Sequence, residues 1–405
     1  MLILVINSGS SSIKASLYDI GGSADVAASA PLWQANVDLK EHKVEFQSKG
    51  ETHKESALNQ DDEENIFAFL LNSLWHGEYS VVSSQTEIKA VGHRIVHGGP
   101  KYSSSVLIDD EVKEHIRQCA EFAPLHNPAN LHGIEAVEKE LPGVPQVAVF
   151  DTAFHHNLPA ASATYAIPFE FSERYKIRRY GFHGISHQYC STRAAQLLNR
   201  RTSGFRVIVA HLGNGCSMSA VRDGASIDTT MGFTPLDGLV MGTRSGAVDP
   251  GILLYLLTKE AHTHDELEEV LEHKSGLRGI SGTTSDMREI LEARDKGDKR
   301  AQLAFDVFVH SLTGYTGSML AQLDGADAIV FTGGIGEHVP ELRSAVCKQL
   351  SFAGVALDDQ LNQNWKTDSD VSISSSKIRV LVIHTQENWT IAKETHQVVS
   401  TGVVR

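Results

Sequence analysis

The chain has 405 residues, of which 41% are hydrophobic and 7% aromatic, a composition typical of an ordinary soluble protein. A single hydrophobic core rarely grows this large, so the length predicts two domains. The net charge of -14, from 50 acidic side chains against 36 Lys and Arg, argues against a general nucleic-acid binder, whose surface must be basic.

The four cysteines carry no paired spacing, which is typical of a reduced, cytosolic protein. They are Cys119, Cys190, Cys216 and Cys347. The opening MLILVIN has no basic region and is too short for a signal peptide, and no apolar stretch approaches the ~20 residues of a membrane span. We expect a cytoplasmic protein with neither a membrane nor a nucleic acid among its partners.

The first predicted elements are two strands of a hairpin, over residues 2–6 and 13–18, which are rich in Leu, Val and Ile. The turn between them, NSGSSS from Asn7 to Ser12, is followed by Lys14. A turn of small residues can expose backbone N–H groups that bind an anion, and the alternative is a hairpin with a plain tip.

Further along, the pattern becomes α/β. Buried strands are predicted over residues 144–150, 205–213 and 326–334. A helix is predicted in DELEEVLEHKSG, with Leu267, Val270 and Leu271 on one face and a stop at Ser275-Gly276. A second is predicted over residues 340–350, where a proline opens the first turn after a glycine-rich turn.

A weak internal repeat links the two halves of the chain. Gly213 to Asp223, GNGCSMSAVRD, aligns with Gly9 to Asp19, GSSSIKASLYD. Each stretch is a small-residue turn that leads into a strand ending in Asp. The repeat favours two related domains that bind a polyphosphate together.

Three segments are candidates for phosphate binding, although no Walker A motif is present. They are Asn7–Ser12 with Lys14, the segment His211–Gly215, and Thr332–His338, which lies between a strand and a helix. Ligands of open α/β sheets bind at such strand ends, beside a helix N-terminus.

Single cationic residues stand in apolar or glycine-rich surroundings: Arg94 in AVGHRIVHGG, Arg244 in MGTRSG and His183 in RRYGFHGISH. A surface arginine is usually only solvated, but a buried cation needs an anionic partner. Asp151 directly follows a predicted buried strand, where a carboxylate binds a metal or an arginine, or caps a helix.

Other chemistries fit less well. HGISH places His183 and His187 four residues apart but lacks the glutamate of a zinc protease. Cys216 suits a small hairpin position better than a nucleophile. GTRSG is not the G-x-S-x-G elbow of serine hydrolases.

Taken together, these stretches resemble the acetate kinase family, within the superfamily of acetate and sugar kinases, chaperone ATPases and actin. The resemblance covers essentially the whole chain and rests on NSGSSSIKASLYD, FDTAFH, RYGFHGISH, TGGIGEH and the long stretch from His211 to Pro250. It implies an α/β fold of two domains with duplicated ribonuclease H-like, actin-like cores and an active-site cleft between them. The first domain would comprise residues 1–150 with 388–405, and the second residues 151–387.

The resemblance also implies site residues. Catalytic roles would fall to Arg94, Asp151, His183 and Arg244, and metal binding to Asn7 and Glu387. The acyl group would meet Arg94, Val96, Leu125, Phe182 and Pro235. ATP would meet Ser10, Ser12, Lys14, His211, Leu212, Gly213, Asn214, Gly215, Asp286, Met287, Arg288, Gly334, Ile335, Gly336, Glu337 and His338. The family typically has two consecutive glutamates near the C-terminus, whereas this chain has Asn388 in the second place.

The implied reaction is acetate + ATP ⇌ acetyl phosphate + ADP, with Mg²⁺, or in its place Mn²⁺, as the metal and a homodimer as the assembly. Acetate is ionised at neutral pH and needs no general base, so Asp151 is better interpreted as orienting an arginine or a metal-bound water. The alternatives are a propionate or butyrate kinase and, in another class, an actin- or chaperone-like ATPase. An ATPase of that kind needs no carboxylate site, so Arg94, Arg244 and the apolar pocket argue against it.

Overall fold

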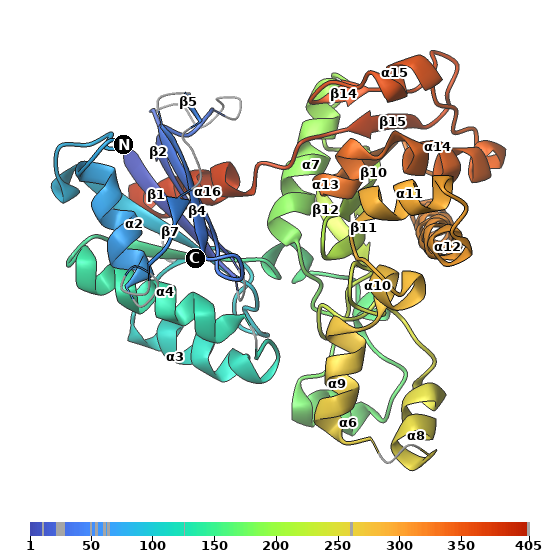
Figure 1. The fold of residues 1–405 in the computed structure, drawn as a ribbon, viewed down its shortest axis with the longest axis horizontal. Coiled ribbons are helices and arrows are strands. Elements are labelled where there is room, and N and C mark those ends of the chain that lie inside the picture. Colours follow the sequence, from blue (N-terminus) through green and yellow to red (C-terminus); the bar gives the residue numbers. More distant parts are fainter. Residues whose placement is uncertain are drawn as a thin grey trace. The chain divides into compact units, whose positions relative to one another are not determined.

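The structure is a computed structural model that describes residues 1–9, 12–21, 29–48, 51–52, 56–59, 62, 65–124, 126–259 and 262–402. The chain divides into two compact units (Figure 1). Unit 1 comprises Met1–His156 and Gln386–Arg405, and unit 2 comprises Asn157–Thr385. Asp151 and Glu387, which the sequence-based boundaries place in the second domain, therefore belong to unit 1.

Unit 1 is built on a mixed sheet in the order β5-β4-β3-β2-β1-β7-β9-β8, with β6 on β4. Its strands are β1 (Leu2–Ser8), β2 (Ser12–Asp19), β3 (Trp33–Asp38), β4 (Lys43–Ser48), β5 (Glu51–Thr52), β6 (Ser56–Ala57), β7 (Ile88–Ile95), β8 (Val106–Leu107) and β9 (Gln146–Phe150). The hairpin predicted at the start of the chain is confirmed, because β1 and β2 pair antiparallel from Leu2↔Asp19 to Ser8↔Ile13. Strands β7 and β9 then extend the sheet in parallel.

Helices cover both faces of this sheet. They are α2 (Ile66–Trp75), α3 (Asp110–Gln118), α4 (Asn127–Glu140) and α16 (Glu387–Thr401), with 3-10 turns at Gln85–Glu87, Cys119–Glu121 and Ala153–His155. Val91 of β7 packs in the cluster that includes α2 and α4. A Cβ on the next residue, Gly92, would meet Ile391 and Thr395 of α16. Successive residues of a strand point to opposite faces, so α16 lies on the face opposite α2 and α4.

Unit 2 repeats the core of unit 1. Its sheet has the order β12-β11-β10-β13-β15-β14. The strands are β10 (Arg206–Leu212), β11 (Cys216–Arg222), β12 (Ala225–Thr229), β13 (Ala328–Thr332), β14 (Ser369–Asp370) and β15 (Arg379–Val382). From β12 to β15 the pairings run antiparallel, antiparallel, parallel, parallel, as they do from β3 to β9 in unit 1. The duplicated core expected from the resemblance is confirmed.

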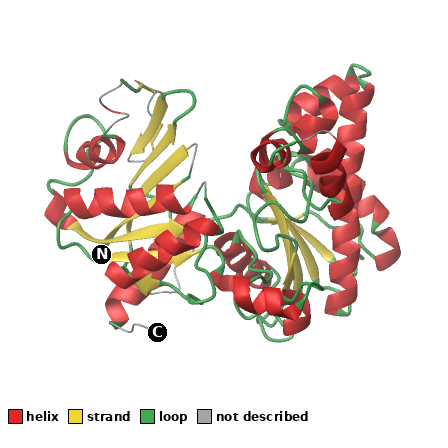
Figure 2. Ribbon diagram, turned by 90° about the horizontal axis from the view of Figure 1, so that it is seen from below, coloured by secondary structure: helices red, strands yellow, loops and turns green. Residues whose placement is uncertain are grey.

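The helices of unit 2 surround its sheet (Figure 2). They are α5 (Ala160–Ala163), α6 (Phe169–Tyr175), α7 (Gly184–Leu197), α8 (Pro250–Lys259), α9 (His264–His273), α10 (Gly276–Ser281), α11 (Met287–Asp295), α12 (Lys299–Leu323), α13 (Gly333–His338), α14 (Pro340–Gln349) and α15 (Asp359–Gln363), with a 3-10 turn at Ser351–Ala353. Helix α7 packs on β10, β11 and β13, and α12 packs on β10 and β11. Within the described residues, no helix is long and apolar enough to span a membrane.

Two local predictions differ from the structure. The segment after β13, predicted as a glycine turn, is the short helix α13, which Gly333 enters with a φ of +76°. The helix predicted to stop at Ser275-Gly276 ends at His273, and Gly276 opens α10 instead. Gly276 has a φ of +59°, and a Cβ there would lie 2.3 Å from the carbonyl oxygen of Met241, so the glycine serves close packing.

Candidate functional site

In unit 1, Arg94 of β7 lies between two predicted site residues. Its Nη2 donates to Oδ2 of Asp151 at 2.5 Å, and its Nη1 donates to Oδ1 of Asn7 at 3.3 Å. Strands β1, β7 and β9 are parallel neighbours, so Asn7, Arg94 and Asp151 meet at their carboxyl ends. The side chain of Asp151 is 2% exposed and that of Arg94 is 18% exposed. The pair is therefore a buried ion pair and not an exposed surface contact.

Electrostatics keep Arg94 charged. Burial opposes the charge, but the negative charges of Asp151 and Glu387 outweigh that cost and raise the pKa of Arg94 above its ordinary value. Its Nε is also buried and makes no hydrogen bond within the described part of the chain. A fixed cation with a remaining donor is suited to hold an anionic ligand.

The two residues expected to hold a metal both belong to unit 1. Asn7 lies near the end of β1, and Glu387 is the first residue of α16. Amide and carboxylate oxygens are the hard ligands that Mg²⁺ takes, and protein sites usually supply only one or two of them beside substrate phosphates. The donor set therefore fits Mg²⁺. Asn388 turns to the sheet instead, where its Nδ2 donates to Oγ of Ser16 at 2.9 Å.

Lys14 of β2 stands directly opposite Asn7 in the hairpin register. Directly opposite residues of an antiparallel pair project to the same face, so the exposed Lys14 amine lies on the side of Asn7. Ser12 opens β2. Ser10 and Leu125 lie outside the described residues.

The remaining acyl-pocket candidates are divided between the units. Val96 follows the end of β7, is buried, and donates its N–H to Oδ1 of Asn130 at 3.0 Å. Phe182 and Pro235 belong to unit 2, where Phe182 is buried.

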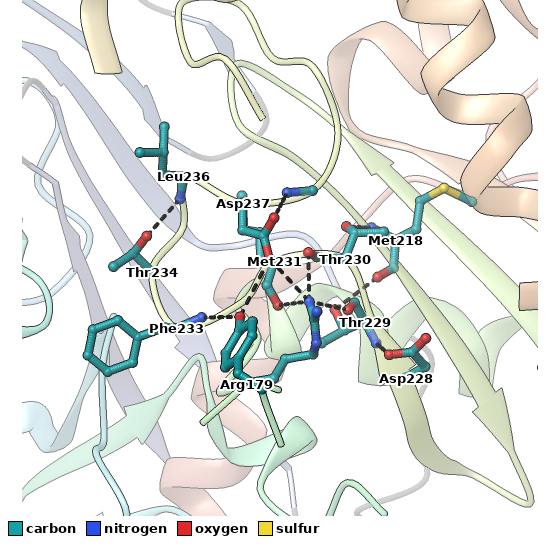
Figure 3. A network of polar contacts seen from close by, with 12 residues as sticks. Arg179, Met218, Asp228, Thr229, Thr230, Met231, Phe233, Thr234, Leu236 and Asp237 are labelled. Atoms are coloured by element: carbon teal, nitrogen blue, oxygen red, sulfur yellow. Dashed lines mark hydrogen bonds and ion pairs between the residues drawn. The ribbon is translucent and has the colours of Figure 1, made fainter. Parts of the chain in front are cut away.

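The loop that carries Pro235 is fixed by Arg179 (Figure 3). Nη1 of Arg179 donates to the carbonyl oxygens of Thr229 and Thr230 at 3.1 and 3.0 Å and pairs with Asp237 at 3.5 Å. The carbonyl oxygen of Pro235 in turn accepts a bond from Nη1 of Arg244 at 3.4 Å. A predicted pocket residue and a predicted catalytic residue of unit 2 therefore lie in contact.

Histidines gather where α7 meets β10 and β11. His183 caps α7 in a left-handed conformation, with a φ of +55°, and stacks on His211 with ring centroids 4.3 Å apart. Its Nδ1 is 2.9 Å from Oγ of Ser217, which is also 2.7 Å from Nε2 of His187. The i, i+4 histidine pair noted in the sequence therefore shares a serine hydroxyl.

Arg244 lies beside this histidine group. Its Nε pairs with Oε2 of Glu272 at 2.9 Å, with side chains 21% and 15% exposed. A Cβ added to Gly215 would lie 3.4 Å from Nε2 of His183 and 3.6 Å from Nη1 of Arg244. The side chains of His183 and Arg244 therefore both come close to residue 215, and a side chain larger than that of glycine would crowd them there.

A cavity of about 540 Å³ in unit 2 gathers half of the predicted nucleotide residues. Its lining is Gly213, Asn214, Ser285, Asp286, Met287, Arg288, Gly334, Ile335, His338 and Val339. The volume is within the usual range of small-molecule sites. Asp286 caps α11, and the Arg288 side chain bonded to it lowers the pKa of its carboxyl group.

Other predicted nucleotide residues do not line this cavity. Leu212 and Gly336 are buried in the unit 2 core. Glu337 turns inward, where Oε1 accepts from the N–H of Gly333 at 3.0 Å and Oε2 lies 2.8 Å from Nδ1 of His384. His211 and Gly215 lie at the histidine group.

Sequence reasoning missed Glu272 and Ser217. Glu272 lies on a predicted helix whose three-dimensional partner, Arg244, belongs to a distant loop, so no local pattern marks the pair. Ser217 did leave a signal, because it is a polar residue within a strand that is buried almost throughout. Cys216 is confirmed as a packing residue, since burial raises the pKa of its thiol to about 12.

Comparison with known proteins gives the family. The model of the acetokinase family matches residues 2–393. The acetate kinase of Trichormus variabilis is 50% identical over 97% of this chain and 98% of its own length. That of Gloeobacter violaceus is 49% identical over 98% and 99%.

Solved structures agree. The acetate kinase of Porphyromonas gingivalis has a TM-score of 0.89 and 39% identity, over 98% of this chain and 99% of its own. A propionate kinase from Francisella tularensis has a TM-score of 0.86 and 41% identity over the same shares. The chain therefore belongs to the acetokinase family and is a phosphotransferase whose acceptor is a carboxyl group.

Proposed function

We propose that the protein is an acetate kinase that catalyses acetate + ATP ⇌ acetyl phosphate + ADP with Mg²⁺. The observation that carries the proposal is the unit 2 cavity. It is lined by residues of three segments predicted to bind ATP, which are 211–215, 286–288 and 334–338. The buried Arg94–Asp151 pair supports a carboxylate site, and the acetate kinases among the relatives support acetate as the acceptor.

The nucleotide would enter the unit 2 cavity. The Gly213–Asn214 turn and the Gly334–Ile335 turn present little side-chain bulk, so backbone groups can approach the phosphates. Asp286 and Arg288 form an ion pair that would border the nucleotide, and Met287 adds an apolar surface.

Acetate would bind as a carboxylate held by Arg94. Its pKa lies near about 4, so the carboxylate oxygen is already a nucleophile at neutral pH. The oxygen lone pair forms the bond to the γ-phosphorus as the bond from that phosphorus to the β,γ-bridging oxygen breaks, and that electron pair leaves with ADP. No proton moves, so Asp151 holds Arg94 in place rather than acting as a base.

Arg244 and His183 would stabilise the negative charge of the transferring phosphoryl group. Both lie within 3.6 Å of the position that a Cβ on Gly215 would take. Positioning and electrostatic stabilisation supply nearly all the catalysis in phosphoryl transfer. When bound, Mg²⁺ neutralises phosphate charge, and Asn7 and Glu387 are the residues of this chain that would hold it.

The test is an assay for ADP with acetyl phosphate trapped by hydroxylamine. We expect both products to require acetate and Mg²⁺. Release of ADP at the same rate without any carboxylate would instead indicate an ATPase and contradict the proposal.

Propionate is the second candidate acceptor, because a propionate kinase is among the similar solved structures. The comparison is kcat/KM for acetate, propionate and butyrate in the same assay. One methylene changes binding in an apolar pocket by only about 1–3 kcal/mol. We therefore expect acetate to be preferred, propionate to be a measurable but poorer substrate, and butyrate to be near background. A higher kcat/KM for propionate would assign the protein as a propionate kinase.

We also propose that the protein forms a homodimer through unit 2. Helix α8 is largely apolar and has no buried residue, although Ile252, Leu254, Tyr255 and Leu257 all lie on it. Phe169, Phe171 and Tyr175 of α6 are exposed as well. Exposed apolar surface of this kind supports an interaction with another protein surface. In a two-fold symmetric dimer, the same surface of a second copy would cover it.

A further inference from the structure

Ser217 of β11 joins two imidazole rings of unit 2. Its Oγ is 2.9 Å from Nδ1 of His183 and 2.7 Å from Nε2 of His187. Ser217 and His187 are fully buried. Both distances are those of good hydrogen bonds, so the hydroxyl is part of the support of His183.

A serine hydroxyl has a single hydrogen, so it can donate to at most one of the two rings and accepts from at least one of them. At least one of the two facing ring nitrogens therefore carries a proton, and the hydroxyl can donate only to a nitrogen that presents a lone pair. The tautomers of His183 and His187 are coupled through this one hydroxyl group.

The direction of this relay decides what His183 presents at its other nitrogen. If His187 donates to Ser217 and Ser217 donates to Nδ1 of His183, the proton of a neutral His183 stays on Nε2. Nε2 lies near Gly215, where an added Cβ would be 3.4 Å from Nε2 of His183 and 3.6 Å from Nη1 of Arg244. An N–H at that position stabilises a phosphoryl oxygen, whereas a lone pair repels it.

We propose that Ser217, with His187 behind it, is a positioning residue that orients the ring of His183 and keeps its proton on Nε2. The stacked His211 restrains the plane of the His183 ring, and Ser217 fixes its rotation within that plane. This role rests on the proposed function, in which His183 meets the phosphoryl group.

The kinetic test compares Ser217→Ala with Ser219→Ala. Ser219 lies on the same strand and face and is equally buried, but its hydroxyl bonds Ser226 and the carbonyl oxygen of Asp228. Hydrogen-bond partners that orient metal-ligating imidazoles are worth about 10–100-fold, and we expect an effect of the same scale here. Ser217→Ala should therefore lower kcat by about 10–100-fold with little change in KM for ATP or acetate. Ser219→Ala should keep the kcat of the unaltered protein. Equal losses of kcat in both variants, or none in Ser217→Ala, would overturn the proposal.

The second readout is the tautomer of His183, measured by ¹⁵N NMR of histidine-labelled full-length protein, with the signals of His183 assigned from a His183→Asn variant. We expect a protonated Nε2 and an unprotonated Nδ1 in the unaltered protein, and a mixture of tautomers in Ser217→Ala. An unprotonated Nε2 in the unaltered protein would overturn the relay, whether or not Ser217→Ala folds. Failure of the proposed function would appear separately, as ADP formation that does not depend on acetate.

Discussion

At the scale of single residues, each of the two predicted catalytic arginines forms an ion pair with one carboxylate. Arg94 pairs with Asp151, and Arg244 pairs with Glu272. Each carboxylate engages only part of a guanidinium that carries five N–H donors, so donors remain for a ligand while the group stays charged and oriented. The sequence predicted both arginines and Asp151 as site residues but not Glu272, because an ion pair across distant segments leaves no local pattern.

Because each arginine stays charged and oriented, we expect a large loss of activity when either one is removed. Arg94→Ala and Arg244→Ala should each lower kcat by about 10³–10⁵-fold, since a charge directed at transition-state oxygens contributes that much in phosphoryl transfer. The measurements are kcat and the thermal unfolding midpoint. The matched control is Arg117→Ala, which removes an exposed ion pair with Glu114 and should leave kcat unchanged. An active Arg94→Ala or Arg244→Ala variant would remove that arginine from the catalytic set.

A second residue-scale prediction concerns stability in acid. Burial lowers the pKa of His93 to about 4, against the opposing hydrogen bond of Gln146. The unfolded chain takes up this proton near pH 6.5, so the unfolded state binds more protons between pH 6.5 and 4. The contribution of His93 to the free energy of unfolding is therefore fully present above about pH 7. It falls as the pH drops through this window, by about 2 kcal/mol at pH 5 for His93 alone.

Urea unfolding at pH 7 and pH 5 checks this prediction. His93→Gln should reduce the difference between the two free energies of unfolding, and the exposed His264→Gln should not. His97, whose pKa burial lowers to about 3, adds to the loss in the same direction. An unchanged pH dependence in His93→Gln would contradict the assignment.

At the scale of elements, the opening hairpin and the buried strands β9, β10 and β13 were predicted, whereas other strands and the helix in a glycine-rich segment were not. Strands β9, β10 and β13 are continuous apolar runs because they are buried on both faces, and the sequence reveals such runs directly. Helix α13 contains three glycines, so propensity argues against a helix. Side-chain hydrogen bonds support it instead: the Glu337 carboxylate accepts from the N–H of Gly333 within the helix, and buried Arg343 of α14 donates to the carbonyl oxygens of Gly336 and Glu337.

Gly92 shows how one missing side chain sets the position of a whole element. A Cβ there would lie 2.2 Å from Oγ1 of Thr395 and 2.8 Å from Cγ2 of Ile391. Gly92→Ala should therefore push α16 from the sheet and destabilise unit 1 by about 1–3 kcal/mol or more. Since α16 begins at Glu387, the variant should also require more Mg²⁺ for half-maximal activity.

Thermal unfolding and Mg²⁺ titration of the activity test this prediction. Gly314→Ala on α12 is the control, because its added Cβ meets nothing within 4 Å. It should leave the Mg²⁺ requirement unchanged and raise stability slightly, since Ala favours a helix interior more than Gly does. A Thr395→Ala change combined with Gly92→Ala should recover part of the lost stability. A fully stable Gly92→Ala variant would show that α16 is not held by this close approach.

At the scale of the whole molecule, one strand topology carries two different sets of predicted site residues. In unit 1 the carboxyl ends of β1, β7 and β9 carry Asn7, Arg94 and Asp151. In unit 2 the corresponding end of β10 leads into the Gly213–Gly215 turn beside the histidine group and the cavity. The sequence repeat predicted the shared scaffold. Only the three-dimensional positions show that Arg94 and the predicted metal ligands lie in unit 1, while most of the predicted nucleotide residues lie in unit 2.

The last prediction concerns assembly. If α8 forms the dimer interface, the unaltered protein should have a mass in solution of about twice 44.1 kDa, measured by light scattering after size-exclusion chromatography. Leu254, which is 67% exposed, lies at the centre of α8, and in a two-fold interface a charge placed there appears twice. Leu254→Glu should shift the mass to that of a single chain at micromolar concentration. Phe352→Glu, at a side chain that is 80% exposed on a different part of unit 2, is the control and should leave the dimer intact. A single-chain mass for the unaltered protein at every concentration would contradict the dimer, and an intact Leu254→Glu dimer would place the interface elsewhere.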